Sequence, residues 1–113
     1  MAEIKNIKQI FHFANIKNKK EREKFLNESD DEIVREIVEI LANFLIGKIK
    51  VSNKALQNIR SHKNKIRKLS RTKSFKNAKK ILIQTGGWAN ILVPLLVTIG
   101  GSLITKLLNE IHK

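Results

Sequence analysis

The basic residues of the sequence are the ones whose type and spacing could do chemistry. Residues 48–80 contain thirteen Lys and Arg and no Asp or Glu, so the block cannot neutralise itself. Cations at this density bind phosphate groups, either of a nucleic acid or of an anionic membrane. The remaining interpretation is a helix surface that is merely solvated. We expect the following side chains to bind nucleic acid: Lys48, Lys50, Lys54, Arg60, Lys63, Lys65, Arg67, Lys68, Arg71, Lys73, Lys76, Lys79 and Lys80.

The spread of these cations indicates which part of a nucleic acid they contact. They lie around the predicted helices and continue past them, which favours the phosphate backbone of double-stranded DNA over base edges. Stacking on single strands needs more aromatic side chains than Phe75 and Trp88. A helix-turn-helix regulator is the alternative, with five polar side chains that could reach base edges: Asn53, Gln57, Asn58, Arg60 and Asn64.

The excess charge of the chain is confined to this block. The formal net charge is +13, whereas residues 1–47 carry −1 and residues 81–113 carry +1. A length of 113 residues suits one small domain, or one domain with a tail. We divide the chain into N-terminal amphipathic helices (1–47), a basic nucleic-acid-binding helical segment (48–85), and a Gly-Gly junction followed by an apolar C-terminal helix (86–113).

The hydrophobic pattern predicts an all-α fold, a small helical bundle with a basic helical segment and an apolar C-terminal helix. Apolar residues recur at helical spacing, and there is one proline. A short amphipathic helix spans Ile4 to Phe11. The most regular helix follows Ser29, which forms a capping box with Glu32. It ends at Gly47, which suits a C-terminal cap.

The basic block is predicted to contain two helices. The first begins at Ser52 and continues as a single helix through most of the block. Thr72 or Ser74 caps the second, and Gly86–Gly87 ends it.

The apolar C-terminal part of the chain has three interpretations. No charged residue occurs from Ile81 to Thr105, which meets the roughly 20-residue length of a membrane span. The densest apolar run, Ile91 to Ile104, is shorter and is more typical of a buried or interfacial helix, with a kink near Pro94. Residues 88–113 therefore pack on the N-terminal helices, self-associate, or insert in an anionic membrane.

The residues that catalytic sites need are scattered along the sequence. His12, His62 and His112 have no metal-ligand spacing, and the glycine pairs do not belong to a phosphate-binding loop. Asp30 and Asp31 are explained as helix-start residues. There is no cysteine, hence no disulfide or thiolate site. We therefore expect no enzyme activity, no catalytic or metal-binding residue and no cofactor.

The order of basic block, Gly-Gly and apolar run resembles the precursor of adenovirus core protein X. It is more closely similar to the counterpart proteins of adintoviruses and other Polinton-like elements. The residues that carry the resemblance are KIRKLSRTKSFKNAKKILIQTGGWANILVPLLVTIGGSLI, 65–104. The resemblance implies a basic segment that condenses the viral genome inside the virion. It also implies cleavage by an adenain-type viral protease after a Gly-Gly-type site, which frees an apolar C-terminal part.

Carried over to this sequence, the processing site is Gln84, Thr85, Gly86 and Gly87, with the cut before Trp88. Gln84 stands where the family prefers an aliphatic residue or Met. The resemblance implies a location in the virion and the host nucleus, and the alternatives are the cytoplasm or a membrane surface. Residues 1–47 have no counterpart in the adenovirus precursor, and we expect them to bind a partner or to shield the basic block.

Overall fold

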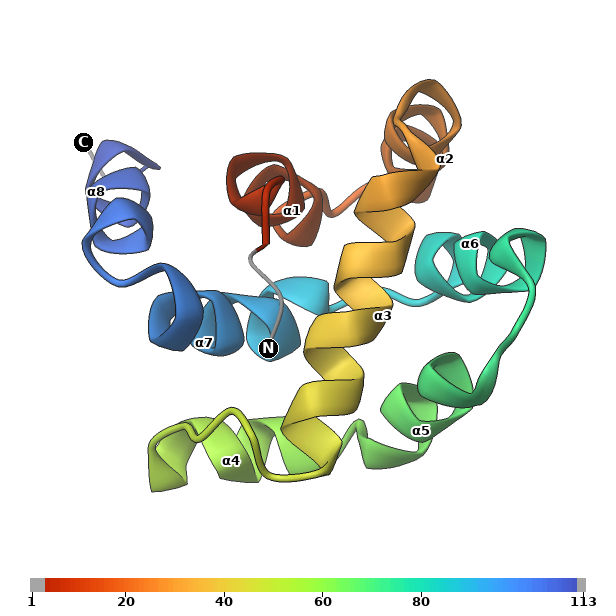
Figure 1. Cartoon of the computed structure of the whole chain (residues 1–113). Helices are drawn as coiled ribbons and strands as arrows, with labels where there is room; N and C mark the ends of the chain where they lie inside the picture. Colours follow the sequence, from red (N-terminus) through yellow and green to blue (C-terminus); the bar gives the residue numbers. More distant parts are fainter. Residues whose placement is uncertain (1–3, 112–113) are drawn as a thin grey trace.

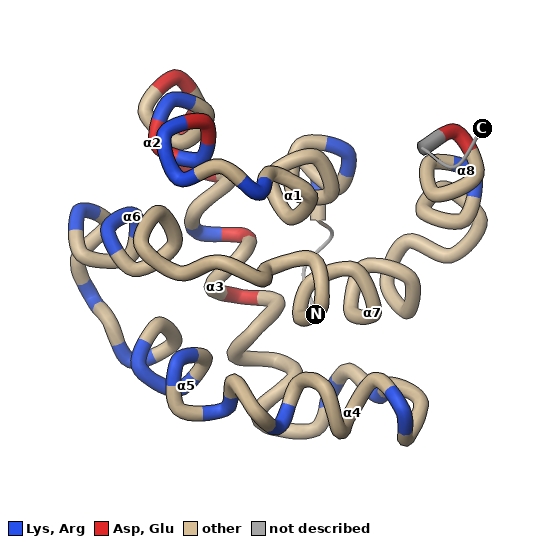
Figure 2. The backbone as a smooth tube through the Cα atoms, turned by 180° about the vertical axis from the view of Figure 1, so that it is seen from behind, with Lys and Arg blue, Asp and Glu red and all other residues tan. Residues whose placement is uncertain are grey.

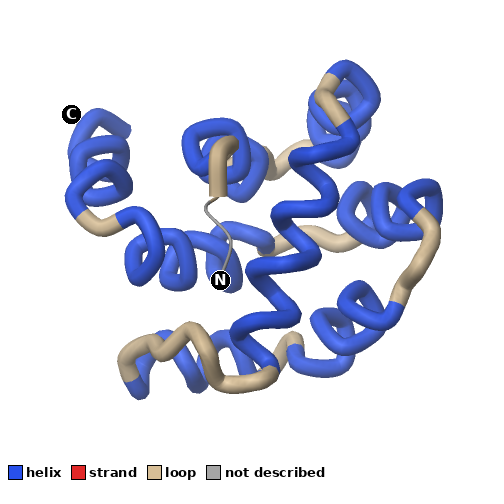
Figure 3. Tube along the Cα trace, in the orientation of Figure 1, coloured by secondary structure: helices blue, strands red, loops and turns tan. Residues whose placement is uncertain are grey.

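The structure is a computed structural model that describes residues 4–111 and the side chains of residues 4–110. Within this range the chain forms eight helices and no strand, and 77% of it is helical, so the predicted all-α class is confirmed (Figures 1 and 3). The helices are α1 (Ile7–Ala14), α2 (Lys19–Glu28), α3 (Asp31–Leu45), α4 (Asn53–Arg60), α5 (Lys63–Arg71), α6 (Phe75–Gln84), α7 (Trp88–Gly100) and α8 (Ser102–Ile111).

Helix α3 runs through the middle of the fold, and α1, α5 and α6 pack against it (Figure 1). Its sequence places apolar residues at helical spacing, and Val34, Ile37, Ile40 and Leu41 are fully buried. Because these residues face several neighbours at once, α3 supports both the N-terminal helices and the basic helices of the chain.

The start of α3 differs from the capping box that the sequence predicts. Asp30, not Ser29, is the N-cap, and its carboxylate accepts a hydrogen bond from the backbone N–H of Glu32. Ser29 instead ends α2, where its hydroxyl donates to the carbonyl oxygen of Phe25. The reason is that α2 extends to Glu28 and uses Ser29 for its own termination.

The end of α3 agrees with the prediction. Gly47 has a φ of +82°, a conformation that glycine adopts without steric cost. Its N–H donates to the carbonyl oxygen of Phe44 at 3.1 Å, and the N–H of Lys48 donates to that of Asn43 at 2.9 Å. This pair of bonds is a Schellman motif, and it turns the chain out of α3 toward α4.

The basic helix predicted from Ser52 is two helices, and this prediction was wrong. Ser52 does cap α4, accepting a hydrogen bond from the N–H of Ala55 at 3.2 Å. The chain then breaks at Ser61–His62, between α4 and α5. The break lets α4 pack on α7 while α5 packs on α3, and each half buries an isoleucine, Ile59 in α4 and Ile66 in α5.

The C-terminal apolar run also contains two helices. Helix α7 includes Pro94, and the chain turns from α7 to α8 at Gly100–Gly101. Gly101 has a φ of +54°, and a Cβ on Gly100 would lie 2.7 Å from Cγ1 of Ile104, so both positions require glycine. This turn brings α8 against α7.

Helix α7 is a core helix of this fold. It packs on α1 and α4, and Ile91, Leu92, Leu95 and Leu96 are fully buried. Within the described chain, no single helix has the length and apolar character to cross a bilayer. Helices α6 and α7 reach that length and apolar character only when taken together, and a bend of 114° separates them. The sequence left three interpretations of the apolar tail. In the structure its first helix, α7, packs on the N-terminal helix α1.

All three segments of the sequence contribute to one hydrophobic core. Trp88 is the largest of its fully buried side chains. Two charged side chains are buried as well, Arg22 and Glu36. The Glu36 carboxylate accepts hydrogen bonds from the backbone N–H and the side-chain amide of Asn6, at 3.2 and 2.6 Å, so this charge is paired with donors rather than left alone.

Candidate nucleic-acid interface

Helix α5 carries the highest density of positive charge. Ile66 and Leu69 are fully buried, and they hold the helix on α3. All five of its cations are exposed, namely Lys63, Lys65, Arg67, Lys68 and Arg71. The hydroxyl of Thr72 donates to the carbonyl oxygen of Lys68 at 2.9 Å and closes the last turn. Cations in this last turn also complement the negative end of the helix dipole.

Helix α4 and the segment before it add four more cations. Ile59 is the buried anchor of α4, and Lys54 and Arg60 point outward. Lys48 and Lys50 are exposed on the extended segment that leads into α4. The backbone of this segment is tied to α7, because the hydroxyl of Thr98 donates to the carbonyl oxygen of Lys50 at 3.1 Å.

Helix α6 forms the third part of the basic surface. Ser74 caps it by accepting from the N–H of Asn77, and Ala78 and Leu82 bury its inner face. Its exposed cations, together with the residue just before its cap, are Lys73, Lys76 and Lys80. The guanidinium carbon of Arg35 lies 5.7 Å from the ring centroid of Phe75, a cation–π contact that ties the start of α6 to α3.

Almost all of these cations are free of acidic partners. Twelve of the thirteen are exposed, and Lys79 is half-buried. Lys79 makes the one ion pair within the described chain, with its Nζ 3.6 Å from Oδ1 of Asp31. The other twelve have no carboxylate within reach in that part of the structure. Their mutual repulsion therefore has to be offset by counterions or by a bound polyanion. We call these thirteen side chains the cationic surface.

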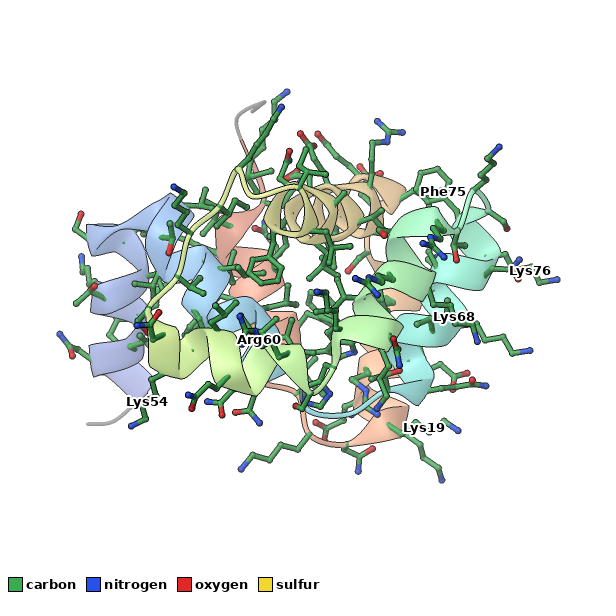
Figure 4. All side chains as sticks on the ribbon, turned by 90° about the horizontal axis from the view of Figure 1, so that it is seen from below. Lys19, Lys54, Arg60, Lys68, Phe75 and Lys76 are labelled. Atoms are coloured by element: carbon green, nitrogen blue, oxygen red, sulfur yellow. The ribbon has the colours of Figure 1, made fainter. Side chains whose placement is uncertain are left out.

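The basic helices α4, α5 and α6 carry no acidic residue, whereas the other helices that carry acids have charges of both signs. Figure 2 shows Lys and Arg on α4, α5 and α6 with no Asp or Glu among them, while the acids lie on α2, on α3 and on α8. Seen from below, Lys54, Arg60, Lys68 and Lys76 follow one another across the molecule from α4 to α6 (Figure 4). The fold measures 32 × 32 × 26 Å, so a surface that crosses it matches about nine base pairs at roughly 3.4 Å each.

Two grooves lined largely by polar side chains border α6, one of the helices of this surface. One, of about 360 Å³, lies between α5 and α6 and includes Lys68 and Lys80. The other, of about 730 Å³, lies between α2 and α6. Both grooves include Lys80, Asn77 and Gln84. Amide side chains between cations can donate hydrogen bonds to phosphate oxygens as well.

The second groove contains a cation that sequence reasoning missed. Lys19 begins α2 and lines the groove opposite Lys76 and Lys80, and Figure 4 shows it on the same side of the molecule as Lys68 and Lys76. The same groove also contains an acid of α2, Glu23. No signal in the sequence identifies Lys19, because it lies in a segment of mixed charge, far from the basic block.

The candidate base-reading residues do not share one helix. Asn53, Gln57, Asn58 and Arg60 are exposed on α4, whereas Asn64 is exposed on α5. The break at Ser61–His62 therefore separates Asn64 from the other four. A single recognition helix in the major groove would need them in one continuous element.

The Gly-Gly junction lies between α6 and α7. Gln84, Gly86 and Gly87 are exposed and Thr85 is half-buried. The next side chain, Trp88, is only 1% exposed, and its Nε1–H donates to the carbonyl oxygen of Leu82 at 2.9 Å. Gly87 caps α7 with a φ of +80°. The junction is thus a short exposed loop whose C-terminal side enters the core at once.

A buried arginine fixes the other side of the junction. Nε and Nη2 of Arg22 both donate to the carbonyl oxygen of Ile83, at 3.0 and 2.9 Å. Its Nη1 donates to the carbonyl oxygen of Lys17 at 2.9 Å. Arg22 therefore connects the end of α6 to the chain between α1 and α2, and the loop 84–87 is held from both ends.

The two histidines within the described residues, His12 and His62, form no metal site with other residues. His12 is exposed and lies against the ring of Phe25, and His62 is half-buried at the start of α5; His112 lies outside the described residues. In the portion that the structure covers, no three His, Asp or Glu side chains come together as a metal site requires.

Comparison of the chain with known protein families, with curated protein sequences and with solved structures finds no match. Its relationship to the adenovirus core protein X family is therefore a proposal.

Proposed function

We propose that this protein is a virion core protein of a virus or virus-like element, which binds and condenses double-stranded DNA non-specifically through the cationic surface. The observation that carries the proposal is the set of twelve exposed cations with no carboxylate partner among the described residues. Free cations release condensed counterions from DNA when they contact its phosphates, and this release drives binding without regard to sequence.

The charge of the protein can be compared with the charge of the DNA that it could cover. DNA carries one negative charge per roughly 1.7 Å of duplex, which is about 19 charges over the 32 Å width of the fold. The protein carries a net charge of +13. Six to eight phosphate contacts would neutralise roughly a third or more of the charge beneath one bound molecule, which lowers the repulsion between neighbouring duplexes.

The proposed function includes processing of the chain as a precursor. An adenain-type protease would cut between Gly87 and Trp88, within the virion or the host nucleus. The exposure of Gly86 and Gly87 supports recognition of the junction, and the burial of Trp88 makes cleavage dependent on local opening of the fold. Membrane insertion of α7 is less favoured, since the buried face of α7 would have to leave the core first.

A salt-titrated gel shift tests DNA binding. We would measure Kd for three unrelated 30-base-pair duplexes at several salt concentrations from about 50 to 300 mM. If six to eight cations contact phosphates, log K should fall with log[salt] with a slope of roughly −5 to −7, and the three duplexes should bind within twofold of one another. A flat salt response would overturn the proposal. A strong preference for one duplex would favour a sequence-reading regulator.

A further inference from the structure

An apolar groove lies between the end of α3 and α4, apart from the polar grooves of the cationic surface. Its volume is about 400 Å³, which is within the range of roughly 300–1,000 Å³ that ligand sites occupy. Its floor consists of apolar side chains from α3, from the extended segment 48–52 and from α4, namely Phe44, Leu45, Ile49, Val51, Leu56 and Ile59. We call it the α3–α4 groove.

The backbone explains why this groove stays open. The Schellman turn at Gly47 sends the chain away from α3. The bond from Thr98 to the carbonyl oxygen of Lys50 then holds the extended segment against α7. Because the segment is fixed at both points, it does not close onto α4. Leu56 and Val51 keep part of their surface in solvent as a result.

The rim of the groove is entirely positive. Lys50, Arg60 and Lys63 line it, and no Asp or Glu does. None of these three cations has a carboxylate partner within the described chain. An apolar floor under a cationic rim is complementary to an occupant that is apolar on one side and anionic on the other. Ile46, which is 67% exposed, lies in the chain between the lining residues Leu45 and Gly47.

We propose that the α3–α4 groove binds an acidic amphipathic peptide segment of a partner protein. Apolar side chains of the peptide would enter the groove, and its carboxylates would pair with the cations of the rim. The partly exposed floor favours a peptide over an acyl chain, because a lipid tail needs a site that encloses most of its surface. A peptide helix needs only one of its faces covered.

The groove shares three residues with the cationic surface, and this has a consequence for DNA binding that rests on the proposed function. Lys50, Arg60 and Lys63 belong both to the rim of the groove and to the cationic surface. A carboxylate that pairs with any one of them removes it from the phosphates. The acidic partner and DNA should therefore weaken each other's binding by the same factor.

The test uses the full-length protein and a synthetic probe. The probe is a fluorescein-labelled 14-residue peptide with Leu and Phe at helical spacing (i, i+3, i+4, i+7) and Glu at most other positions. A control peptide has the same charges but Ser in place of Leu and Phe. Measured by fluorescence anisotropy, the probe should bind at least tenfold more tightly than the control. Equal binding of the two peptides would mean plain charge attraction and would overturn the proposal.

Variants of the groove locate the binding site. Leu56→Asn and Val51→Asn change no charge and alter partly exposed positions, so each should weaken the probe about tenfold or more while the Kd for DNA stays within twofold. Circular dichroism and thermal unfolding check the fold of both variants. Probe binding is compared with the wild type for each variant that keeps the wild-type spectrum. Unchanged probe binding by a folded variant would contradict the proposal, as would tight binding of sodium dodecanoate without binding of the probe.

Two outcomes separate this proposal from the function proposed for the cationic surface. If DNA binding fails but the probe still discriminates between the wild type and Leu56→Asn, the groove stands and the DNA function falls. If both bind, added probe should displace DNA, and Arg60→Gln with Lys63→Gln should weaken both ligands.

Discussion

Arg22 and Ile83 are separated by 61 positions in the sequence, yet two nitrogens of the Arg22 guanidinium donate to the single carbonyl oxygen of Ile83. The arginine is 4% exposed, so both bonds are made away from water. Charge-assisted hydrogen bonds of this kind are stronger than neutral ones. They fasten α2 to the end of α6, immediately before the Gly-Gly junction.

Replacement of Arg22 by Met should therefore destabilise the fold. The methionine keeps most of the apolar stem but leaves the carbonyl oxygen of Ile83 without its donors, which costs about 1–3 kcal/mol. Urea denaturation followed by tryptophan fluorescence would measure the change, since Trp88 is the one tryptophan. Lys24→Met on the exposed face of the same helix is the control and should leave the midpoint almost unchanged. Equal effects would mean that the Arg22 bonds contribute nothing.

The two glycines of the junction should respond differently to alanine. Gly87 has a φ of +80°, whereas Gly86 has no such strain, and a methyl group added at either position would have no neighbouring atom within 4 Å. Gly87→Ala should cost about 1–2 kcal/mol, because the left-handed region is unfavourable for an L-residue by that amount. Gly86→Ala should be neutral or slightly stabilising, since alanine restricts the unfolded chain. Thermal unfolding of the pair measures this, and similar losses in both would contradict the assigned backbone.

Part of this structure could be predicted from the sequence because the signals are local. The apolar spacing of α3, the cap at Ser52 and the left-handed glycine at position 47 each depend on residues within one or two turns. Clustering of cations in the sequence likewise indicated a cationic surface, because it does not depend on how the helices pack. Exposure of twelve of the thirteen agrees with that expectation.

Other features depend on contacts between distant segments and left no local signal. Ile59 and Ile66 have the spacing of one helical stripe, but they lie on two helices, of which α4 packs on α7 and α5 packs on α3. Lys19 reaches the basic helices only because α2 packs on α6. Nothing near Arg22 in the sequence shows that its partner is a carbonyl oxygen at the end of α6.

Charge neutralisation on α5 should reduce the salt dependence of DNA binding. Lys65→Gln, Arg67→Gln and Lys68→Gln together remove three exposed cations from the cationic surface. Each phosphate contact contributes about −0.9 to the log–log slope, so the triple variant should lose roughly 2–3 from its magnitude. The control removes the same number of exposed charges elsewhere, through Lys5→Gln, Lys8→Gln and Lys24→Gln. Equal losses in the two variants would show that net charge matters and its position does not.

The pair between Lys79 and Asp31 predicts a change in the opposite direction. Within the described chain, Asp31 is the one carboxylate that pairs with a cation of the cationic surface. Its Oδ1 lies 3.6 Å from Nζ of Lys79. Asp31→Asn would free Lys79 for a phosphate contact and raise the magnitude of the slope by up to about 0.9. Stability should change little, because a pair at the protein surface contributes about 0–1 kcal/mol. Glu28→Gln removes an exposed acid that has no cation partner within the described residues, and it should leave the slope closer to that of the wild type.

The Gly87–Trp88 bond should be cut slowly in the folded protein. A protease has to hold residues on both sides of the bond in an extended form, and Trp88 is buried with its indole N–H bonded to the carbonyl oxygen of Leu82. Cleavage therefore requires local opening, so its rate should follow the population of the open form. Incubation with an adenain-type protease and intact-mass measurement would give that rate. Arg22→Met should be cut faster than the wild type, and Lys24→Met should not.

Cleavage alone should not release residues 88–113. In the intact chain the side chains of Ile91, Leu92, Leu95 and Leu96 are fully buried, and their helix packs on α1 and α4. Each such side chain contributes about 1.5–3 kcal/mol through its burial, and this contribution does not depend on the Gly87–Trp88 bond. Native mass spectrometry of the cut protein should find the two fragments together, and denaturing conditions should separate them. Prompt release under native conditions would mean that α7 leaves the core as soon as the chain is cut. That result would favour membrane insertion of residues 88–113.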